Sequence, residues 1–168
     1  MDKVWLQSYP AGVPAEIDVN EFESIGQLFE HSVRKYRDNV AYINMGKSIT
    51  YGELDGHTRD FAAYLQSLGL AKGARVAVMM PNLLQDPISI YGILRGGFTV
   101  VNCNPLYTAR ELEHQLKDSG AEAIVIVENF ASVLQDCIAN TPVKHVIVTS
   151  LGDMLGFPKG AIVNFVVK

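Results

Sequence analysis

The stretch "RVAVMM", residues 75–80, decides the fold class, because it begins a regular alternation of strand-like and helix-like segments. Further apolar runs rich in β-branched residues follow it, and we expect each to be a strand: 98–103 (FTVVNC), 123–127 (AIVIV) and 145–150 (HVIVTS). Helical patterns separate these runs, at about 88–94, 108–120 and 129–140. This alternation predicts an α/β protein with a mostly parallel sheet and helices on both faces. Right-handed crossovers make such a sheet doubly wound.

The segment before the alternation predicts a helix and a hairpin. Ser24 is a suitable N-cap for a helix over 24–37. The apolar side chains of that helix recur at helical spacing and should form one face: Ile25, Leu28, Phe29, Val33 and Tyr36. Two short β-type runs within 40–50 flank Met45-Gly46-Lys47 and predict the hairpin.

Two capping boxes mark helix starts. Thr50 and Glu53 have the spacing in which the two side chains satisfy each other's main-chain N–H groups, and the helix that follows should end near Gly69. Thr108 and Glu111 repeat this spacing before the helix that runs to about residue 120. Both helices therefore have well-defined starting residues.

Composition describes a single globular domain. The chain has 168 residues, 48% hydrophobic and 19% charged, which is enough apolar material for a core. A net charge of -4 with scattered basic residues argues against nucleic acid as a partner. Cys103 and Cys137 are too few for a disulfide framework or a zinc site and fit reduced thiols in the cytoplasm. No run approaches the ~20 apolar residues of a membrane span. Residues 1–23 lack a signal-peptide core and predict an extended N-terminal arm.

Neither nucleotide-binding fingerprint is present. The pattern G-x-G-x-x-G does not follow any predicted strand, and Gly92, Gly96 and Gly97 should instead end a helix and allow close packing. The segment 156–160, Gly-Phe-Pro-Lys-Gly, resembles a phosphate loop, but no Ser or Thr follows Lys159. The residues favour a surface turn before a new helix, and a weak phosphate contact is the alternative.

Few polar residues suggest a site. The four histidines, His31, His57, His114 and His145, share no ligand spacing, and no serine has a nucleophile-elbow context. Glu111 and His114 could suit a metal, although a solvated helix face explains them more simply. Tyr107 and Arg110 flank a helix start just after a strand, where doubly wound folds bind ligands. A structural Tyr packed under the loop is the competing interpretation. These residues alone define no active site.

A family resemblance supplies more. Thr50-Tyr51 with Leu54, Leu68-Gly69 with Gly73, and Met80-Pro81-Asn82 follow one another as in the N-terminal portion of the adenylate-forming enzymes. The later elements Asn104–Thr108, Glu111-Leu112 and Ser119–Ala121 keep the order and spacing of that superfamily. Three stretches narrow the resemblance to the long-chain fatty acid–CoA ligases of bacteria: 1–18, 79–97 and 159–168. Ala74, where that family usually has aspartate, and Asp86 are local departures.

The resemblance implies the activity of a complete ligase. A fatty acid carboxylate attacks the α-phosphate of ATP with magnesium present, and coenzyme A then attacks the acyl-adenylate to give acyl-CoA and AMP. The family's nucleotide motifs match no position here, so the resemblance assigns no catalytic, cofactor-binding or metal-binding residue. We expect residues 1–168 to be the N-terminal part of the large AMP-binding domain, with Lys168 as a boundary inside a longer protein. Residues 151–168 should be a connector that ends before the nucleotide loop.

Several expectations follow for the chain by itself. It should be an inactive scaffold that needs the rest of its own chain, should hold no ATP, magnesium or coenzyme A, and should form a homo-oligomer through apolar surface. The resemblance also implies peripheral contact with the inner face of the cytoplasmic membrane. Two alternatives stay open: an adenylate-forming enzyme for a different acid, and a non-catalytic interaction module.

Overall fold

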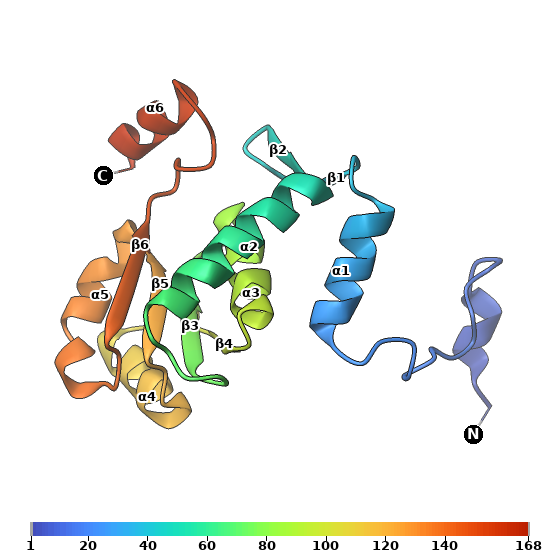
Figure 1. Cartoon of the computed structure of the whole chain (residues 1–168), viewed down its shortest axis with the longest axis horizontal. Coiled ribbons are helices and arrows are strands. Elements are labelled where there is room, and N and C mark those ends of the chain that lie inside the picture. Colours follow the sequence, from blue (N-terminus) through green and yellow to red (C-terminus); the bar gives the residue numbers. More distant parts are fainter. Residues whose placement is uncertain (1, 168) are drawn as a thin grey trace.

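The computed structural model describes residues 2–167, and its centre is a four-stranded parallel sheet (Figure 1). The strands lie in the order β4-β3-β5-β6, and each neighbouring pair is parallel. Their bounds are β3 Arg75–Met79, β4 Thr99–Asn102, β5 Ala123–Val127 and β6 His145–Thr149. The predicted parallel α/β sheet is confirmed.

Helices cover both faces of the sheet. Helices α2 (Tyr51–Ser67) and α3 (Gln85–Arg95) lie on one face, and α4 (Ala109–Ser119) and α5 (Ala131–Gln135) lie on the other (Figure 1). Successive residues of β3 point to opposite faces, as the pleat requires. Val76 and Val78 therefore join one buried core, while Ala77 and Met79 join the other.

The strand order reverses next to β3. The chain moves outward from β3 to β4 through α3, then returns through α4 to β5 on the other side of β3. Because α3 and α4 lie on opposite faces, the sheet is wound in both directions from β3. In folds of this kind ligands bind at the carboxyl ends of the strands where the order reverses.

A smaller layer packs beside the α2 and α3 face. It consists of α1 (Ile25–Lys35) and the hairpin of β1 (Val40–Asn44) and β2 (Lys47–Thr50). Met45 and Gly46 both have positive φ values, 49° and 77°, which suits a two-residue hairpin turn. The predicted N-cap also forms, since Gln27 N donates to Ser24 Oγ at 3.1 Å.

The apolar face predicted for α1 is only partly covered by its neighbours. Only Phe29 and Val33 of its predicted apolar face are buried, while Ile25, Leu28 and Tyr36 are 59%, 44% and 40% exposed. Helix α1 packs against α2 and α3 through Phe29 and Val33. Ile25 and Leu28 line a cavity of about 160 Å³, and the Tyr36 ring lies 6.0 Å from that of Tyr51 between centroids. Spacing along a helix identifies its apolar side chains but does not show how wide a strip the neighbours cover.

The prediction of one continuous helix over 129–140 is wrong. The segment is divided into η2 (Glu128–Phe130), α5 and η3 (Ile138–Asn140). Cys137 leaves helical geometry with φ of -128° and buries its thiol in the core shared with α4. Thr141 is extended because it precedes a proline, which disfavours helical geometry.

The two ends of the chain differ. Residues 2–23, with the short helix η1 (Val4–Ser8), extend away from the body at the right of Figure 1, and η1 buries no side chain. At the other end, α6 (Lys159–Val166) follows Pro158, as the interpretation of a turn before a new helix predicted. In the part of the chain that the structure describes, no helix combines the length and apolar character needed to cross a bilayer.

Candidate functional site

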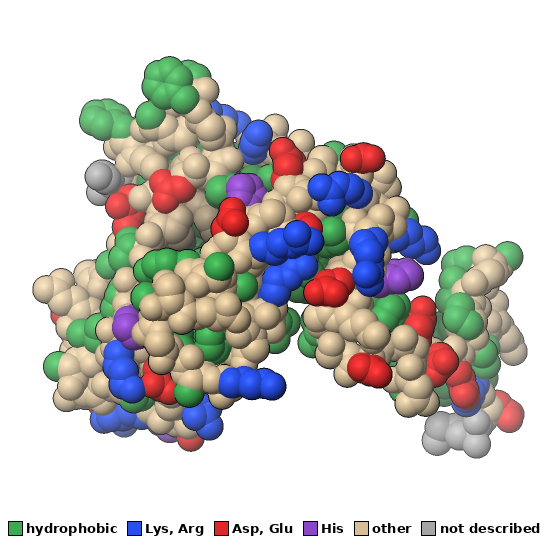
Figure 2. Space-filling view, in the orientation of Figure 1, with side chains coloured by type: hydrophobic (Ala, Val, Ile, Leu, Met, Phe, Trp, Pro, Cys, Tyr) green, Lys and Arg blue, Asp and Glu red, His purple; other side chains and the backbone are tan. Residues whose placement is uncertain are grey.

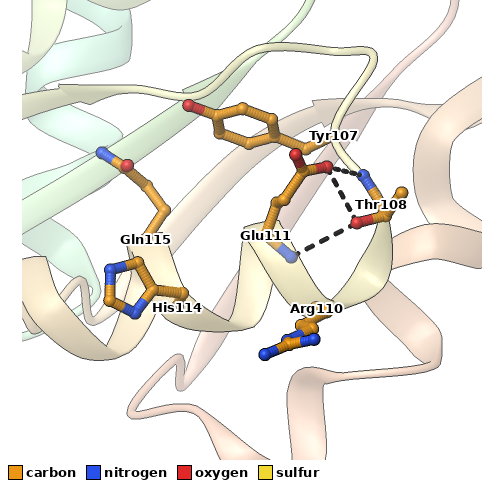
Figure 3. A pocket seen from close by; sticks show the side chains of 6 residues that line it. All are labelled: Tyr107, Thr108, Arg110, Glu111, His114 and Gln115. Atoms are coloured by element: carbon orange, nitrogen blue, oxygen red, sulfur yellow. Dashed lines mark hydrogen bonds between the residues drawn. The ribbon is translucent and has the colours of Figure 1, made fainter.

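A cavity of about 610 Å³ lies at the start of α4, after the carboxyl end of β4 (Figure 3). An Asx turn shapes the loop above it, because Leu106 N donates to Asn104 Oδ1 at 2.9 Å. The residues that line the cavity come from that loop and the first two turns of α4: Tyr107, Thr108, Arg110, Glu111, His114 and Gln115. The fold therefore brings together the residues that the sequence marked as candidates.

The carboxylate at this cavity belongs to Glu111, and it forms the hydrogen bonds of the predicted capping box. Glu111 Oε2 accepts hydrogen bonds from Thr108 N and Thr108 Oγ1, both at 2.8 Å (Figure 3). The bonds from the Thr108 main chain and hydroxyl hold the pKa of Glu111 below its usual value. Glu111 is thus a charged helix cap, and His114 lies one turn further along the helix.

Metal binding gains no support here. Within residues 2–167, no group of three or more His, Cys, Asp or Glu side chains lies close enough together to hold an ion. The histidines are on separate elements: His31 on α1, His57 on α2, His114 on α4 and His145 on β6. The weaker interpretation of Glu111 and His114 as ligands therefore lacks a third donor in this region.

Tyr107 and Arg110 do not converge on a common point. Tyr107 is half-buried and packs against the core beneath the loop, as the structural interpretation of this residue expected. Arg110 is exposed and lies on the other side of the first helical turn from the Tyr107 ring (Figure 3). The cavity is an open notch at a helix start, without a nucleophile, a base and an orienting group in contact with one another.

The phosphate-loop candidate at 156–160 has a structural role. Lys159 is the first residue of α6, and its ammonium group donates to the main-chain carbonyl of Met45 in the hairpin turn. Gly160 N donates to Gly156 O at 2.7 Å, so this N–H is also occupied. In this arrangement the lysine and this amide contact the protein itself, and the Ser or Thr that follows the lysine in a phosphate loop is missing.

The glycines of α3 behave as the sequence predicted. Gly96 caps the helix, and Gly97 follows with φ of 83°. A Cβ on Gly92 would come within 2.7 Å of Phe61 Cδ1, so the absence of a side chain lets α2 approach α3 closely. These glycines serve helix termination and packing.

Sequence reasoning missed a buried ionic network between α2 and α3. Arg95 Nη2 lies 2.7 Å from Asp55 Oδ1, and Arg95 Nη1 donates to Thr58 Oγ1 at 2.7 Å. Asp55 is only 5% exposed, and Arg59 binds its other oxygen at 2.8 Å. The i,i+4 spacing of Asp55 and Arg59 could have predicted their ion pair, but no local pattern predicts that Arg95 joins it.

A second missed feature is Glu128, which directly follows β5 where the strand order reverses. Its Oε1 atom is buried and has no hydrogen-bond partner among residues 2–167. A lone acidic residue after a strand carries no motif, so the sequence offered no signal for it.

Comparison with known proteins places this fold in a family. The profile of the family described as "AMP-binding enzyme" matches residues 29–166. The chain belongs to this family. It is 58% identical over its whole length to the long-chain-fatty-acid–CoA ligase of Salmonella typhimurium, and 36% identical over 157 residues to that of Bacillus subtilis. The predicted resemblance is confirmed.

The same relatives are much longer than this chain. The chain spans 30% of the Salmonella typhimurium protein and 28% of the Bacillus subtilis protein. Among solved structures it resembles a long-chain-fatty-acid-CoA ligase from Archaeoglobus fulgidus, with a TM-score of 0.71 and 27% identity over 79% of this chain and 29% of that one. A benzoate CoA ligase from Burkholderia xenovorans matches with a TM-score of 0.70 and 25% identity over 74% of this chain and 25% of that one.

Proposed function

We propose that this chain is the amino-terminal part of a long-chain fatty acid–CoA ligase. The observation that carries the proposal is 58% identity along the whole chain to a ligase of that name. In the complete enzyme, a fatty acid carboxylate oxygen would bond to the α-phosphorus of ATP and expel pyrophosphate. The sulfur of coenzyme A would then bond to the acyl carbon and release AMP. Magnesium would stabilise the charge that develops on the phosphates.

Within that enzyme, the chain would supply scaffold. Two observations support this role: Lys159 is anchored to the hairpin turn, and Glu111 serves as a helix cap. The groups that bind ATP, magnesium and coenzyme A would come from the remainder of the enzyme, and residues 151–168 would be the connector toward them. No residue of this chain is proposed as catalytic, nucleotide-binding or metal-binding.

The direct test is palmitate-dependent exchange of pyrophosphate into ATP. We expect no exchange above background from the 168-residue chain, and full exchange from a chimaera in which it replaces the matching 30% of the Salmonella typhimurium ligase. An active chain by itself would overturn the scaffold role. A well-folded but inactive chimaera would contradict the assignment to this enzyme.

Lys159→Met in the chimaera tests whether Lys159 anchors the hairpin turn or binds phosphate. Loss of a hairpin anchor should reduce exchange by less than about tenfold and lower thermal stability. Loss of a group that stabilises transition-state charge typically reduces the rate about 10²–10³-fold. An exchange rate reduced by about 10²–10³-fold, with thermal stability unchanged, would indicate that Lys159 binds phosphate.

The identity of the acid substrate needs a separate test, because a benzoate CoA ligase shares the fold. Octanoate and benzoate, tested beside palmitate on the gene's full-length product, distinguish the substrate classes. We expect the highest kcat/KM for palmitate. Preference for benzoate would favour the alternative of a ligase for a different acid.

We also propose that the chain by itself self-associates. Large apolar side chains are exposed on β6 and α6: Val146, Val148, Ile162, Phe165 and Val166. Figure 2 shows hydrophobic atoms projecting at the upper left, where α6 lies in Figure 1. Light scattering should show an average mass that rises with protein concentration. Phe165→Ser should weaken the self-association more than Leu106→Ser, which changes an equally exposed apolar residue elsewhere. A constant monomer mass would contradict it.

The proposed enzyme would work in the cytoplasm, in peripheral contact with the inner face of the cytoplasmic membrane. Long-chain acids partition into bilayers, so such contact would bring the enzyme to its substrate. Fractionation of cells that express the full-length protein should recover it partly with membranes at low salt.

A further inference from the structure

A cluster of arginines lies where α1 meets α2 and α3. Figure 2 shows Lys and Arg side chains gathered over the junction of α1 and α2. A small cavity of about 160 Å³ at this junction is lined by Glu30, Val33, Arg34, Arg37, Asp55, Arg59 and Arg95. We call it the arginine pocket. Its four arginines and two carboxylates leave a net charge of +2, although the chain as a whole carries -4.

The inner part of the arginine pocket is fixed by buried contacts. Arg95 has 16% of its side chain exposed, pairs with Asp55, and lies 5.4 Å from the centre of the Phe29 ring. The buried side chain of Val33 forms part of the floor. A guanidinium held in this way keeps its position, and less conformational entropy is lost when a ligand binds nearby.

The outer arginines retain unused donors. Arg59 uses one nitrogen for Asp55 and leaves 66% of its side chain exposed. Within residues 2–167, neither Arg34 nor Arg37 forms an ion pair or a side-chain hydrogen bond. The stem of Arg37 packs beside Gly52, where a Cβ would lie 3.2 Å from its Cγ atom. The absence of a side chain at Gly52 therefore leaves room for Arg37 at the rim.

We propose that the arginine pocket binds a phosphate group through Arg34, Arg37 and Arg59. Guanidinium groups present paired N–H donors whose geometry matches phosphate oxygens. Mutual repulsion among these cations falls when an anion sits between them. The cavity is smaller than the ~300–1,000 Å³ pockets that enclose whole drug-sized molecules. It therefore suits a phosphate head that enters from solvent, with the rest of the molecule outside.

This proposal is independent of acid activation, and its test needs no ligase activity. The probes are inorganic phosphate, followed by backbone amide chemical shifts, and vesicles of phosphatidylcholine with or without phosphatidylglycerol, followed by co-sedimentation. Binding of free phosphate at residues 34, 37 and 59 identifies a soluble source. Binding only to vesicles with phosphatidylglycerol identifies a lipid headgroup.

The decisive variant is Arg34→Gln with Arg37→Gln, since both side chains are exposed and neither forms an ion pair within residues 2–167. Each arginine near an anionic surface contributes about 1 kcal/mol, so we expect binding to weaken about 30-fold. The matched control, Lys72→Gln with Arg110→Gln, removes the same charge elsewhere and should weaken binding less than about threefold. Glu30→Gln, which removes a carboxylate from the rim, should tighten it at least twofold.

Two outcomes overturn the proposal. One is no binding of either probe at low ionic strength by a protein whose circular dichroism shows that it is folded. The other is equal loss of binding in the arginine variant and the matched control, which would mean that only net charge matters.

Discussion

The main chains of Gly152 and Gly160 pack directly against each other. A Cβ on either residue would overlap the carbonyl oxygen of the other, so no side chain fits at this crossing. Nearby, Gly152 N donates to Asn164 Oδ1 at 2.6 Å, and Asn164 Nδ2 donates to Asp153 Oδ1 at 3.1 Å. The two glycines thus allow α6 to dock against the turn that follows β6.

Gly160→Ala should loosen α6. The added methyl group must push the two main chains apart, and the hydrogen bond from Gly152 to Asn164 should lengthen or break. We expect amide hydrogen exchange in residues 162–167 to accelerate at least tenfold, with β5 unchanged. Gly56→Ala is the matched control, because that helical glycine has open space around its Cβ position. It should stabilise the protein by up to about 1 kcal/mol. Unchanged exchange in α6 would mean that the crossing imposes no constraint.

Arg95→Met should be strongly destabilising, because it leaves the Asp55 carboxylate buried with only Arg59 beside it. Removing one partner of a buried ion pair typically costs about 3–5 kcal/mol. The free energy of unfolding in urea measures this loss. Arg59→Gln, on the exposed side of the same carboxylate, should cost less than about 1 kcal/mol. Similar losses for both variants would show that Arg95 has no special role in the interior.

The two capping boxes should make stability depend on acid pH. Hydrogen bonds from Thr50 and Thr108 lower the pKa of Glu53 and Glu111 in the folded state. Their stabilising effect is therefore complete above the ordinary glutamate pKa of about 4.3, and disappears as pH falls through the lowered native value. Glu53→Gln with Glu111→Gln keeps an acceptor at each cap but removes the titration. The fall in urea midpoint between pH 7 and pH 3 should become smaller in this variant.

A charge-matched control separates the caps from net charge. Glu21→Gln with Glu23→Gln, both exposed on the arm, removes the same charge without altering a helix cap. This control should keep the pH dependence of the unaltered protein. An equal change in both double variants would rule out the caps as the cause.

Cys103 should react slowly with alkylating reagents in the folded protein. Burial raises the pKa of its thiol to about 11, so very little thiolate is present at pH 8. Compared with an ordinary thiol of pKa about 8.5, labelling by iodoacetamide should be roughly two orders of magnitude slower. Peptide mapping after timed labelling measures each cysteine separately, and urea should abolish the protection. Rapid labelling of Cys103 in the native protein would contradict its burial.

Local signals predicted most of the fold. The hairpin around Met45, the caps at Thr50 and Thr108, and the strand from Arg75 all form where expected. Each depends on residues within about four positions of one another, through a turn, a cap bond or an apolar run. The prediction of one helix over 129–140 was wrong because it relied on local composition. That composition suits a helix and does not reveal that the chain turns inward at Cys137.

The candidate site was predictable only in part. Tyr107, Arg110, Glu111 and His114 were marked from their place after a strand, and the structure does gather them around one cavity. Their orientations were not predictable, since the pairing of Glu111 with Thr108 and the packing of Tyr107 against the core decide which groups remain free.

The sequence by itself determined the alternation of strands and helices, the capped helix starts and the family. Only the tertiary structure decided the role of Lys159, whose partner Met45 lies 114 residues earlier, and the pairing of Arg95 with Asp55 across 40 residues. It also decided that Arg34 and Arg37 meet Arg59 at one pocket. The physical reason is range: backbone preferences act between near neighbours in the chain, whereas these contacts exist only after distant segments have packed together.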